Sequence, residues 1–363
     1  MIFSPIWGGG NETSMNVTWL TARCFGEDLC ATTQIELSLG LVKQGVNLTV
    51  YSPGVFPDTN VNHIPIQRSK IRGRQSASLV KKLRPFLDTI NKSDCVLLDW
   101  KLSALIPKIK TKLVLIDRGP PADRGLLSML QMRVWKRGWK SVKWGCVVSE
   151  QHKKFVDSMI PNISRTIAVL PAGVNTQLFK KSTRKGPIRL VYHGRVDSHR
   201  GIQRVVQLFT SLDQSSPGFE LYIHGKGDMI DEIMKMNLRH VNITGHLEQK
   251  DLARRLTNYD IGILPMPQSK IWKLASPLKR SEYLGAGLLI LGIHHEGHLI
   301  KGEDSQFFCK LFHEDEFLHH AKEWLESLQR DELDALQEKA RSYAVQMLDW
   351  DHSVEQLLSI ISS

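Results

Sequence analysis

A cation and a carboxylate stand three residues apart in SPLKRSEYLGAGLLILGI, residues 276–293. On a helix, Lys279 and Glu282 would point from one face toward the same opening. Ser276 suits the N-cap and Pro277 the first helical position, ahead of a buried strand. A cation and a carboxylate at a helix N-terminus, above the carboxyl end of a sheet, fit a ligand with phosphate and a sugar diol. Alternatively, the two side chains pair only with each other.

A second segment, HGRVDSHRG (193–201), leaves a predicted strand and presents two guanidinium groups before the next helix. The chain would turn at Gly194, so that Arg195 and Arg200 flank a helix N-terminus. Two guanidinium groups there can form a diphosphate cradle, because each can bond to two phosphate oxygens. The other interpretation is a solvated basic loop.

The elements that must position these residues alternate between strand and helix along both halves of the chain. This alternation predicts α/β architecture with parallel sheets covered on both sides. In the first half we expect strands at 15–21, 46–51, 95–98, 113–116 and 146–148, and helices at 31–43, 75–90 and 123–142. In the second half we expect strands at 188–193, 219–224, 241–244, 260–264 and 288–293, and helices at 201–212, 229–236, 249–257, 315–347 and 352–361.

Length and composition favour two folded domains. The 363 residues are 42% hydrophobic and 23% charged, which is typical of globular chains. We expect a loose tail at 1–14, one domain at 15–180, a second at 181–345, and a polar linker within 178–187. The apolar runs are shorter than the roughly 20 residues that span a bilayer. The sequence therefore predicts a soluble or surface-bound protein.

The charge is unevenly distributed between the two halves. Residues 1–185 hold 28 Lys and Arg against 12 Asp and Glu, whereas residues 186–363 hold 20 against 25. The basic half predicts an anionic partner, such as a membrane surface, a lipid phosphate or nucleic acid. Five cysteines without metal-ligand spacing indicate reduced cytosolic thiols, and the six Asn-x-Ser/Thr triplets are then coincidental.

Six segments in order resemble the landmarks of glycosyltransferase family 4. They are VLPAGVNTQLF (169–179), HGRVDSHRG (193–201), HVNITGHLEQKDL (240–252), YDIGILP (259–265), SPLKRSEYLGAG (276–287) and MLDWDHSVEQLL (347–358). The resemblance implies the GT-B architecture, in which two Rossmann-like domains face a cleft and the N-terminal one binds the acceptor. It also implies that residues 346–363 form a helix that crosses back to the first domain.

The resemblance assigns roles to the candidate donor-site residues. Arg195 and Arg200 would bind the donor diphosphate with the help of Lys279, and Glu282 would hold the ribose hydroxyls. Gly194, Ser276 and Pro277 would line the donor site, while Gly245 and His246 would border the base. Fixed cations there would stabilise the leaving diphosphate without a metal ion or another cofactor, and the anomeric configuration would be retained.

The sequence departs from the family pattern at two positions. Leu274 stands where a second glutamate is common, and Leu288 where a proline is usual. A family subgroup with a Pro-x-Lys-x-x-Glu pattern is more similar to this chain. Because of Leu274, a binding protein that keeps the fold but has lost turnover is the alternative function.

Three further segments have an ordinary structural interpretation beside a functional one. In DRGPPADRG (117–125), Asp117 and Arg118 could contact sugar or acceptor, or the segment could be a stiff loop stabilised by an ion pair. In RVWKRGWKSVKW (133–144), Trp135, Trp139 and Trp144 alternate with basic residues; such a helix suits an anionic bilayer surface, unless its tryptophans lie in the core. His294, His295 and His298 have no carboxylate or cysteine beside them in the spacing of a metal site, so we expect a loop without bound metal.

The sequence thus predicts a retaining, metal-independent hexosyltransferase that moves a sugar from a nucleotide-diphosphate sugar to a lipid-linked or other anionic acceptor. We expect it in the cytoplasm, peripherally bound at the inner face of the membrane. Nucleic-acid binding is disfavoured, because the basic half carries no recognisable nucleic-acid motif.

Overall fold

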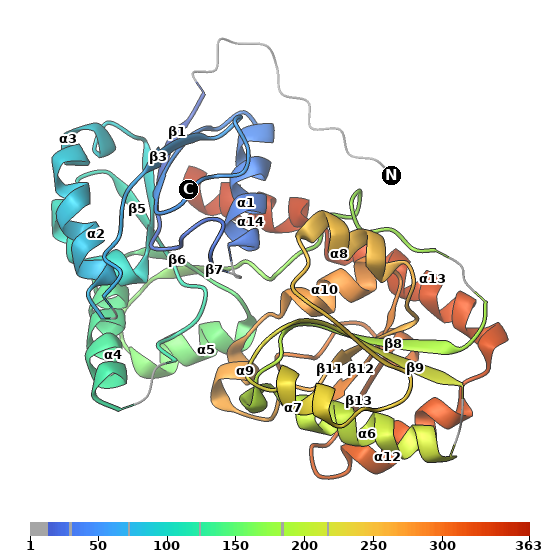
Figure 1. Ribbon diagram of the computed structural model, residues 1–363. Helices are drawn as coiled ribbons and strands as arrows, with labels where there is room; N and C mark the ends of the chain where they lie inside the picture. Colours follow the sequence, from blue (N-terminus) through green and yellow to red (C-terminus); the bar gives the residue numbers. More distant parts are fainter. Residues whose placement is uncertain (1–13, 29–30, 72, 123–124, 183–184, 216–217) are drawn as a thin grey trace, which may run out of the picture.

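The structure, a computed structural model, describes residues 14–363 except 29–30, 72, 123–124, 183–184 and 216–217. It contains two parallel sheets, one in each half of the chain, with helices packed on them (Figure 1). Most of the predicted tail, residues 1–13, lies outside the described residues.

The first sheet has seven parallel strands in the order β3-β2-β1-β4-β5-β6-β7. They are β1 (Asn16–Leu20), β2 (Asn47–Ser52), β3 (Asn62–Pro65), β4 (Cys95–Asp99), β5 (Lys112–Ile116), β6 (Trp144–Val147) and β7 (Thr166–Val169). The connecting helices are α1 (Thr32–Lys43), α2 (Gln75–Leu83), η1 (Arg84–Phe86), α3 (Leu87–Ile90), η2 (Trp100–Lys108), α4 (Gly125–Lys140) and α5 (Glu150–Met159). The helix predicted at 75–90 is therefore divided, and Pro85 lies in the 3₁₀ turn between its parts.

The second sheet has six parallel strands in the order β10-β9-β8-β11-β12-β13. They are β8 (Ile188–Arg195), β9 (Phe219–Lys226), β10 (Val241–Thr244), β11 (Ile261–Leu264), β12 (Leu289–Ile293) and β13 (Cys309–Phe312). Its helices are η3 (Ser198–Arg200), α6 (Ile202–Ser215), α7 (Ile230–Lys235), α8 (Gln249–Leu256), α9 (Lys270–Leu274), α10 (Leu278–Gly285), α11 (Ser305–Phe308), α12 (Phe317–Ser327) and α13 (Arg330–Met347).

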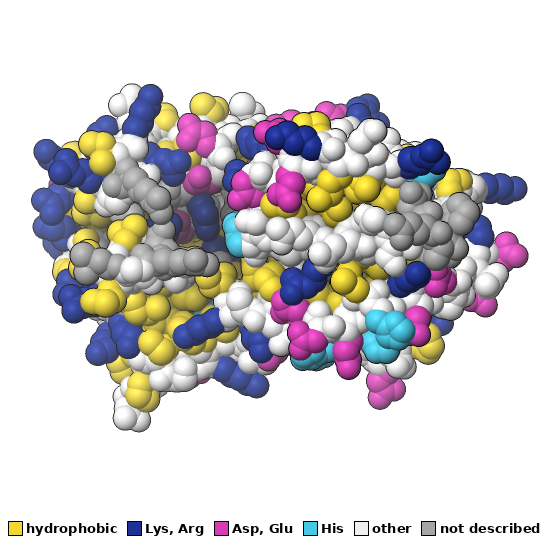
Figure 2. Space-filling model, turned by 60° about the horizontal axis from the view of Figure 1, so that its bottom comes forward, with side chains coloured by type: hydrophobic (Ala, Val, Ile, Leu, Met, Phe, Trp, Pro, Cys, Tyr) yellow, Lys and Arg dark blue, Asp and Glu magenta, His cyan; other side chains and the backbone are white. Residues whose placement is uncertain are grey.

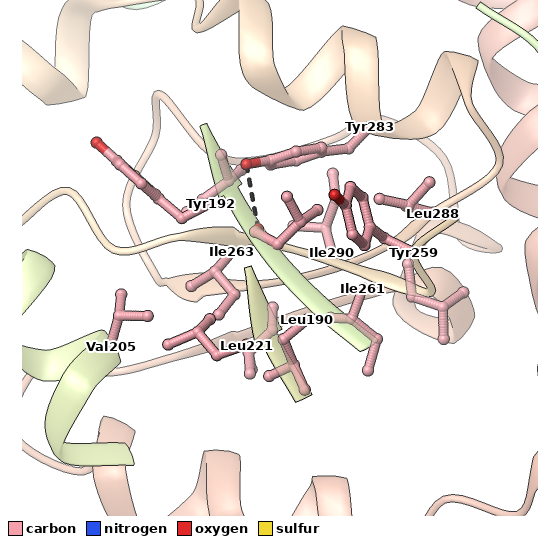
Figure 3. Close-up of a cluster of buried hydrophobic side chains, with 14 of the residues drawn as sticks. Leu190, Tyr192, Val205, Leu221, Tyr259, Ile261, Ile263, Tyr283, Leu288 and Ile290 are labelled. Atoms are coloured by element: carbon pink, nitrogen blue, oxygen red, sulfur yellow. Dashed lines mark hydrogen bonds between the residues drawn. The ribbon is translucent and has the colours of Figure 1, made fainter. Parts of the chain in front are cut away.

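The strand order of the second sheet reverses beside β8, which pairs with β9 on one side and β11 on the other. Ligands of doubly wound sheets bind outside the carboxyl ends of the strands at such a reversal. The tightly packed core beneath it includes Leu190, Tyr192, Ile261 and Tyr283, all less than 2% exposed (Figure 3). The carboxyl end of β8 is therefore supported by a tightly packed core.

The last helix, α14 (Trp350–Ser362), returns to the first domain and packs beside α1, as Figure 1 shows in red and blue. Its apolar face, including Trp350 and Val354, belongs to the same core cluster as Leu37 and Leu41. A Cβ at Gly40 would come within 2.3 Å of Val354, so a glycine permits this close approach. The predicted α/β fold, with two Rossmann-like domains and a returning C-terminal helix, is confirmed.

Candidate active site

A large cleft lies between the two domains, and the carboxyl end of β8 contributes His193, Gly194 and Arg195 to its wall. Gly194 has φ +109°, and a Cβ there would lie 2.9 Å from the Lys279 Nζ atom. The backbone at the carboxyl end of β8 thus runs directly beside the Lys279 ammonium group. Two stretches that are about 80 positions apart in the sequence therefore meet in one part of the cleft.

The two arginines of the predicted diphosphate cradle share one carboxylate. Arg195 donates from Nε and Nη2 to the two oxygens of Asp197, both at 2.9 Å. Arg200 Nε lies 3.7 Å from the same carboxylate, and its guanidinium lies 5.0 Å from the ring centroid of Trp272. Although burial opposes it, Arg195 holds the pKa of Asp197 below its ordinary value. Asp197 therefore fixes both cations in neighbouring positions.

Lys279 and Glu282 project from the first turns of α10, as the sequence predicted, and both line the cleft. The N-cap is Pro277, not Ser276, so the predicted helix start was wrong by one residue. Ser276 instead uses its hydroxyl oxygen to accept from the Ala172 backbone at 2.9 Å. Both Ser276 and Pro277 line the cleft.

Glu282 is 6% exposed, and the nearest basic nitrogen is the Nε2 atom of His193, 3.3 Å from Oε2. Burial raises the pKa of the Glu282 carboxyl to about 7; Lys279 opposes that shift, and Glu36 adds to it. A carboxylate that is buried at the edge of a cleft with so little compensation marks a candidate ligand site.

The remaining predicted donor residues follow β10. His246 lines the cleft and lies 3.9 Å from the Glu248 carboxylate. Gly245 precedes it, directly after the end of β10, with open space around the position of a Cβ. The cleft is also lined by Leu274, which occupies the position of the family's second glutamate and is 8% exposed. An apolar side chain therefore takes the place of a carboxylate at that point.

Asp117 does not contact the cleft, so its predicted contact with sugar or acceptor was wrong. It is 0% exposed, and its carboxylate accepts from Trp135 Nε1 at 2.5 Å, Trp139 Nε1 at 2.8 Å and the Gly119 backbone at 3.0 Å. His152 Nε2 lies 3.2 Å away. Burial alone would raise the pKa of Asp117, but His152, the Trp139 indole and the Gly119 N–H hold it below its ordinary value. Asp117 therefore organises the core.

Its neighbour Arg118 does line the cleft. The guanidinium donates to the Leu170 carbonyl and to the Thr33 hydroxyl, both at 3.0 Å. Arg118 thus braces the start of α1 against the strand end after β7, and the stiff-loop interpretation describes these bonds.

The tryptophans of the basic helix do not form a surface. Trp135 and Trp139 are 0% exposed and belong to a core cluster, and Trp144 is half-buried, with Lys112 and Lys143 each 4.8 Å from its ring centroid. The predicted tryptophan surface for a membrane was therefore wrong. No helix within the described ranges is long and apolar enough to span a bilayer.

The histidines after β12 form the ordinary loop that was predicted. His295 Nε2 lies 3.2 Å from the Met266 carbonyl, and His298 Nδ1 lies 2.7 Å from the Ile293 carbonyl. Their rings stack with centroids 3.7 Å apart. His295 thus bonds to the backbone after β11, and His298 bonds to the backbone at the end of β12.

Three residues were missed by sequence reasoning: His193 and Trp272, which line the cleft, and Asp197, which accepts from Arg195. His193 and Asp197 lie inside the segment HGRVDSHRG, but only Gly194, Arg195 and Arg200 of that segment were given a role from the sequence. Trp272 lies 72 positions from the arginine that it contacts, and a single sequence carries no signal for that contact.

Comparisons with known proteins show a family match for the second half of the chain. Residues 174–346 match the family described as "Glycosyl transferases group 1". A stretch of 107 residues is 29% identical to glycogen synthase of Mycobacterium tuberculosis, covering 27% of this chain and 26% of that protein. The chain thus matches about a quarter of the length of this curated relative.

Solved structures are similar over nearly the whole chain. Sucrose-phosphate synthase from Thermosynechococcus elongatus has a TM-score of 0.80 at 12% identity, covering 96% of this chain and 98% of that one. HepE of Anabaena, solved with UDP and glucose, has a TM-score of 0.72 at 13% identity, covering 96% and 99%. These likenesses show the GT-B fold.

The second domain is therefore a glycosyltransferase group 1 domain, carried by a chain of GT-B architecture. The match over residues 174–346 confirms the resemblance to glycosyltransferase family 4 in the second domain.

Proposed function

We propose that the protein transfers a sugar from a nucleotide-diphosphate sugar to a lipid-linked or other anionic acceptor, with retention of anomeric configuration and without a metal ion. The observation that carries the proposal is the convergence of Arg195, Arg200 and Lys279 with Glu282 in one cleft. HepE of Anabaena, which has a similar fold, was solved in complex with UDP and glucose, and this supports a nucleotide-sugar donor for the present chain.

The cations define the chemistry of the leaving group. When the bond between the anomeric carbon and the diphosphate breaks, negative charge grows on the diphosphate oxygens. Arg195 and Arg200 are held in place by Asp197 before any ligand arrives, so little reorganisation is needed when that charge develops. Lys279 adds a third positive charge beside Gly194. Three protein cations suffice in this scheme, which is the basis for proposing metal independence.

Glu282 suits the pentose of the donor. A carboxylate can accept from both hydroxyls of a vicinal diol, and Glu282 lies on the same helix as Lys279, one turn further along. His246 follows β10 at the rim of the cleft, where it would border the base.

The opposite wall supports an anionic acceptor. The first domain contributes Arg23, Arg68, Lys81, Arg84, Lys101 and Arg118 to the cleft lining. Figure 2 shows Lys and Arg side chains gathered over this domain, on the left, and more Asp and Glu on the other domain. Exposed apolar residues of α4, Leu130 (48%) and Val134 (39%), line the same wall. Cations beside apolar groups fit a lipid-linked phosphate at the cytoplasmic face of a membrane.

The catalytic proposal is tested with Arg195→Ala and the exposed Arg239→Ala as a matched control. A thermal-shift screen across uridine, guanosine and adenosine diphosphate sugars first selects the donor, because a ligand of the folded state raises Tm. We expect Arg195→Ala to lose transfer and donor hydrolysis by at least about 100-fold at nearly unchanged Tm, and Arg239→Ala to retain both. Retained turnover in Arg195→Ala would overturn the phosphate site. Donor binding by the wild type without any turnover would favour the degenerate binding protein that Leu274 suggests.

The acceptor proposal is tested by flotation with vesicles that contain anionic lipid. We expect recovery of the protein at low salt and loss at high salt, and weaker recovery for Lys81→Glu/Arg84→Glu. Absence of binding at low salt would contradict a membrane-bound acceptor.

A further inference from the structure

Glu282 and His193 form a buried pair at the edge of the cleft. Their side chains are 9% and 10% exposed, and Nε2 of His193 lies 3.3 Å from Oε2 of Glu282. Within the described part of the chain, this nitrogen is buried without a hydrogen-bond partner. A buried nitrogen without a partner is costly, so its position beside a carboxylate needs an explanation.

The imidazole of His193 is held firmly in place. Its backbone N–H donates to the Tyr283 hydroxyl at 3.2 Å, and its ring meets the Tyr283 ring edge-on, with centroids 5.0 Å apart at 83°. Tyr283 is 0% exposed and directly follows Glu282 on α10. The same turn of helix thus supplies both the support for the ring and the carboxylate that the ring approaches.

The charge state of the ring suits a donor. Burial lowers the pKa of His193, and the nearby Lys279, His224 and His246 add to that effect. The ring is therefore neutral near pH 7, with one nitrogen carrying a proton. A proton on Nε2 would have the Glu282 carboxylate as its acceptor, at a distance that a small rotation turns into a hydrogen bond.

We propose that His193 is a positioning residue for donor binding: its Nε2–H donates to Glu282 and holds that carboxylate in the orientation that accepts the pentose diol. The inference rests on the proposed function, in which Glu282 binds the diol. His193 would act on the donor only through Glu282. The experiment must therefore measure how strongly the protein distinguishes ligands with and without the pentose diol, and not ligand affinity alone.

The experiment measures the preference for a ribose over a 2′-deoxyribose ligand. The probe is whichever of UDP, GDP and ADP raises the wild-type Tm most, titrated calorimetrically at pH 8 beside its 2′-deoxy counterpart. We expect the wild type to prefer the ribose form by about tenfold or more, since only the ribose 2′-hydroxyl can donate to the charged Glu282 carboxylate. His193→Phe should reduce the preference to about threefold or less, and His193→Gln, which keeps a donor at a similar distance, should restore most of it.

Two further variants separate positioning from packing. In a Glu282→Gln background, adding His193→Phe should change the preference no further, because the two residues act as one unit. His224 is the register neighbour of His193, and its ring nitrogens lie 2.5 Å from the Thr244 hydroxyl and 2.6 Å from the Tyr259 hydroxyl. His224→Phe should lower Tm and leave the preference unchanged. Should His193→Phe fold poorly, His193→Asn, whose amide is too short to reach Glu282, replaces it.

The outcomes separate this inference from the proposed function. A wild-type preference that survives in His193→Phe or His193→Asn would overturn the positioning role while leaving the donor site intact. A wild type that binds the nucleotide without preference for ribose would overturn the role of Glu282, and that of His193 with it. Failure of all three nucleotides to bind the wild type would overturn the proposed function itself.

Discussion

Asp117 in the first domain and Glu282 in the second are both buried carboxylates, but their surroundings differ. Asp117 accepts from two indole N–H groups and a backbone N–H, with His152 beside it, and its pKa lies below the ordinary value. Glu282 has one imidazole at 3.3 Å, and burial raises its pKa to about 7. A carboxylate with a full set of donors holds a core together, whereas one with few donors is available to a ligand.

The contrast implies opposite dependences of stability on pH. The folded-state pKa of Asp117 is depressed, so its contribution is present above the ordinary carboxyl pKa and is lost as the pH falls. The folded-state pKa of Glu282 is raised, so the folded protein binds an extra proton between about pH 4.5 and 7. Ionisation of Glu282 therefore opposes folding as the pH rises through that window.

The largest expected effect is on stability, from Asp117→Ala. Removing this carboxylate leaves two buried indole donors and His152 without an acceptor. We expect a loss of about 3–5 kcal/mol, seen as a marked fall in the Tm of the first domain. Glu282→Gln is the matched control and should be neutral or stabilising above pH 7. An Asp117→Ala protein as stable as the wild type would contradict the structural role.

Lys279→Ala should reduce kcat/KM for the selected donor by about 100-fold. The reason is that Lys279 supplies a cation beside Gly194, where charge develops on the leaving diphosphate. Steady-state kinetics with Lys235→Ala, on the exposed end of α7, as control makes the comparison. Equal loss in both variants would show that the effect is not specific to the cleft.

Donor affinity should increase by up to about tenfold as the pH rises through about 7, since the ionised Glu282 accepts from both hydroxyls of the diol. Calorimetric titration with the selected nucleotide sugar between pH 5.5 and 8.5 measures this. The charged and titratable neighbours that face the pair are Lys279, His193, His224, His246 and Glu36. Glu282→Gln should flatten the profile; an unchanged profile would assign the titration to one of these neighbours.

The smallest expected effect comes from Trp135→Phe. This change removes one donor to Asp117 but keeps an aromatic ring in the core, so we expect a loss of about 1–2 kcal/mol. Trp139→Phe should cost a similar amount. Because both indoles serve one carboxylate, the cost of the double variant in thermal unfolding should differ measurably from the sum. Strict additivity would indicate that Asp117 is not their common partner.

Sequence reasoning reached the fold and the donor wall because their signals are local. Strand and helix alternate with clear periods. Arg195 is the last residue of a strand, and Lys279 lies at a helix start. The opposite wall was harder. Asp117 lies at the carboxyl end of a strand, as Arg195 does, so position alone predicted that it faces the cleft. Its actual environment depends on Trp135 and Trp139, whose burial is set by the packing of α4 and cannot be read from their spacing.

The pairings inside the cleft were also inaccessible to the sequence. His193 and Glu282 are 89 positions apart in the sequence, and their contact depends on how α10 packs beside the end of β8. The contact between Arg200 and Trp272 depends on the position of α9, which carries Trp272, beside the end of η3. Such contacts follow from tertiary packing, and a single sequence does not reveal them.

The most direct test of the central claim is calorimetric titration of the selected nucleotide sugar into the wild type and into Arg195→Ala/Arg200→Ala. If both guanidinium groups bind one diphosphate, the double variant should lose at least about 100-fold in affinity at low salt while its Tm stays within a few degrees of the wild type. Equal affinity in the two proteins would contradict the existence of the diphosphate cradle.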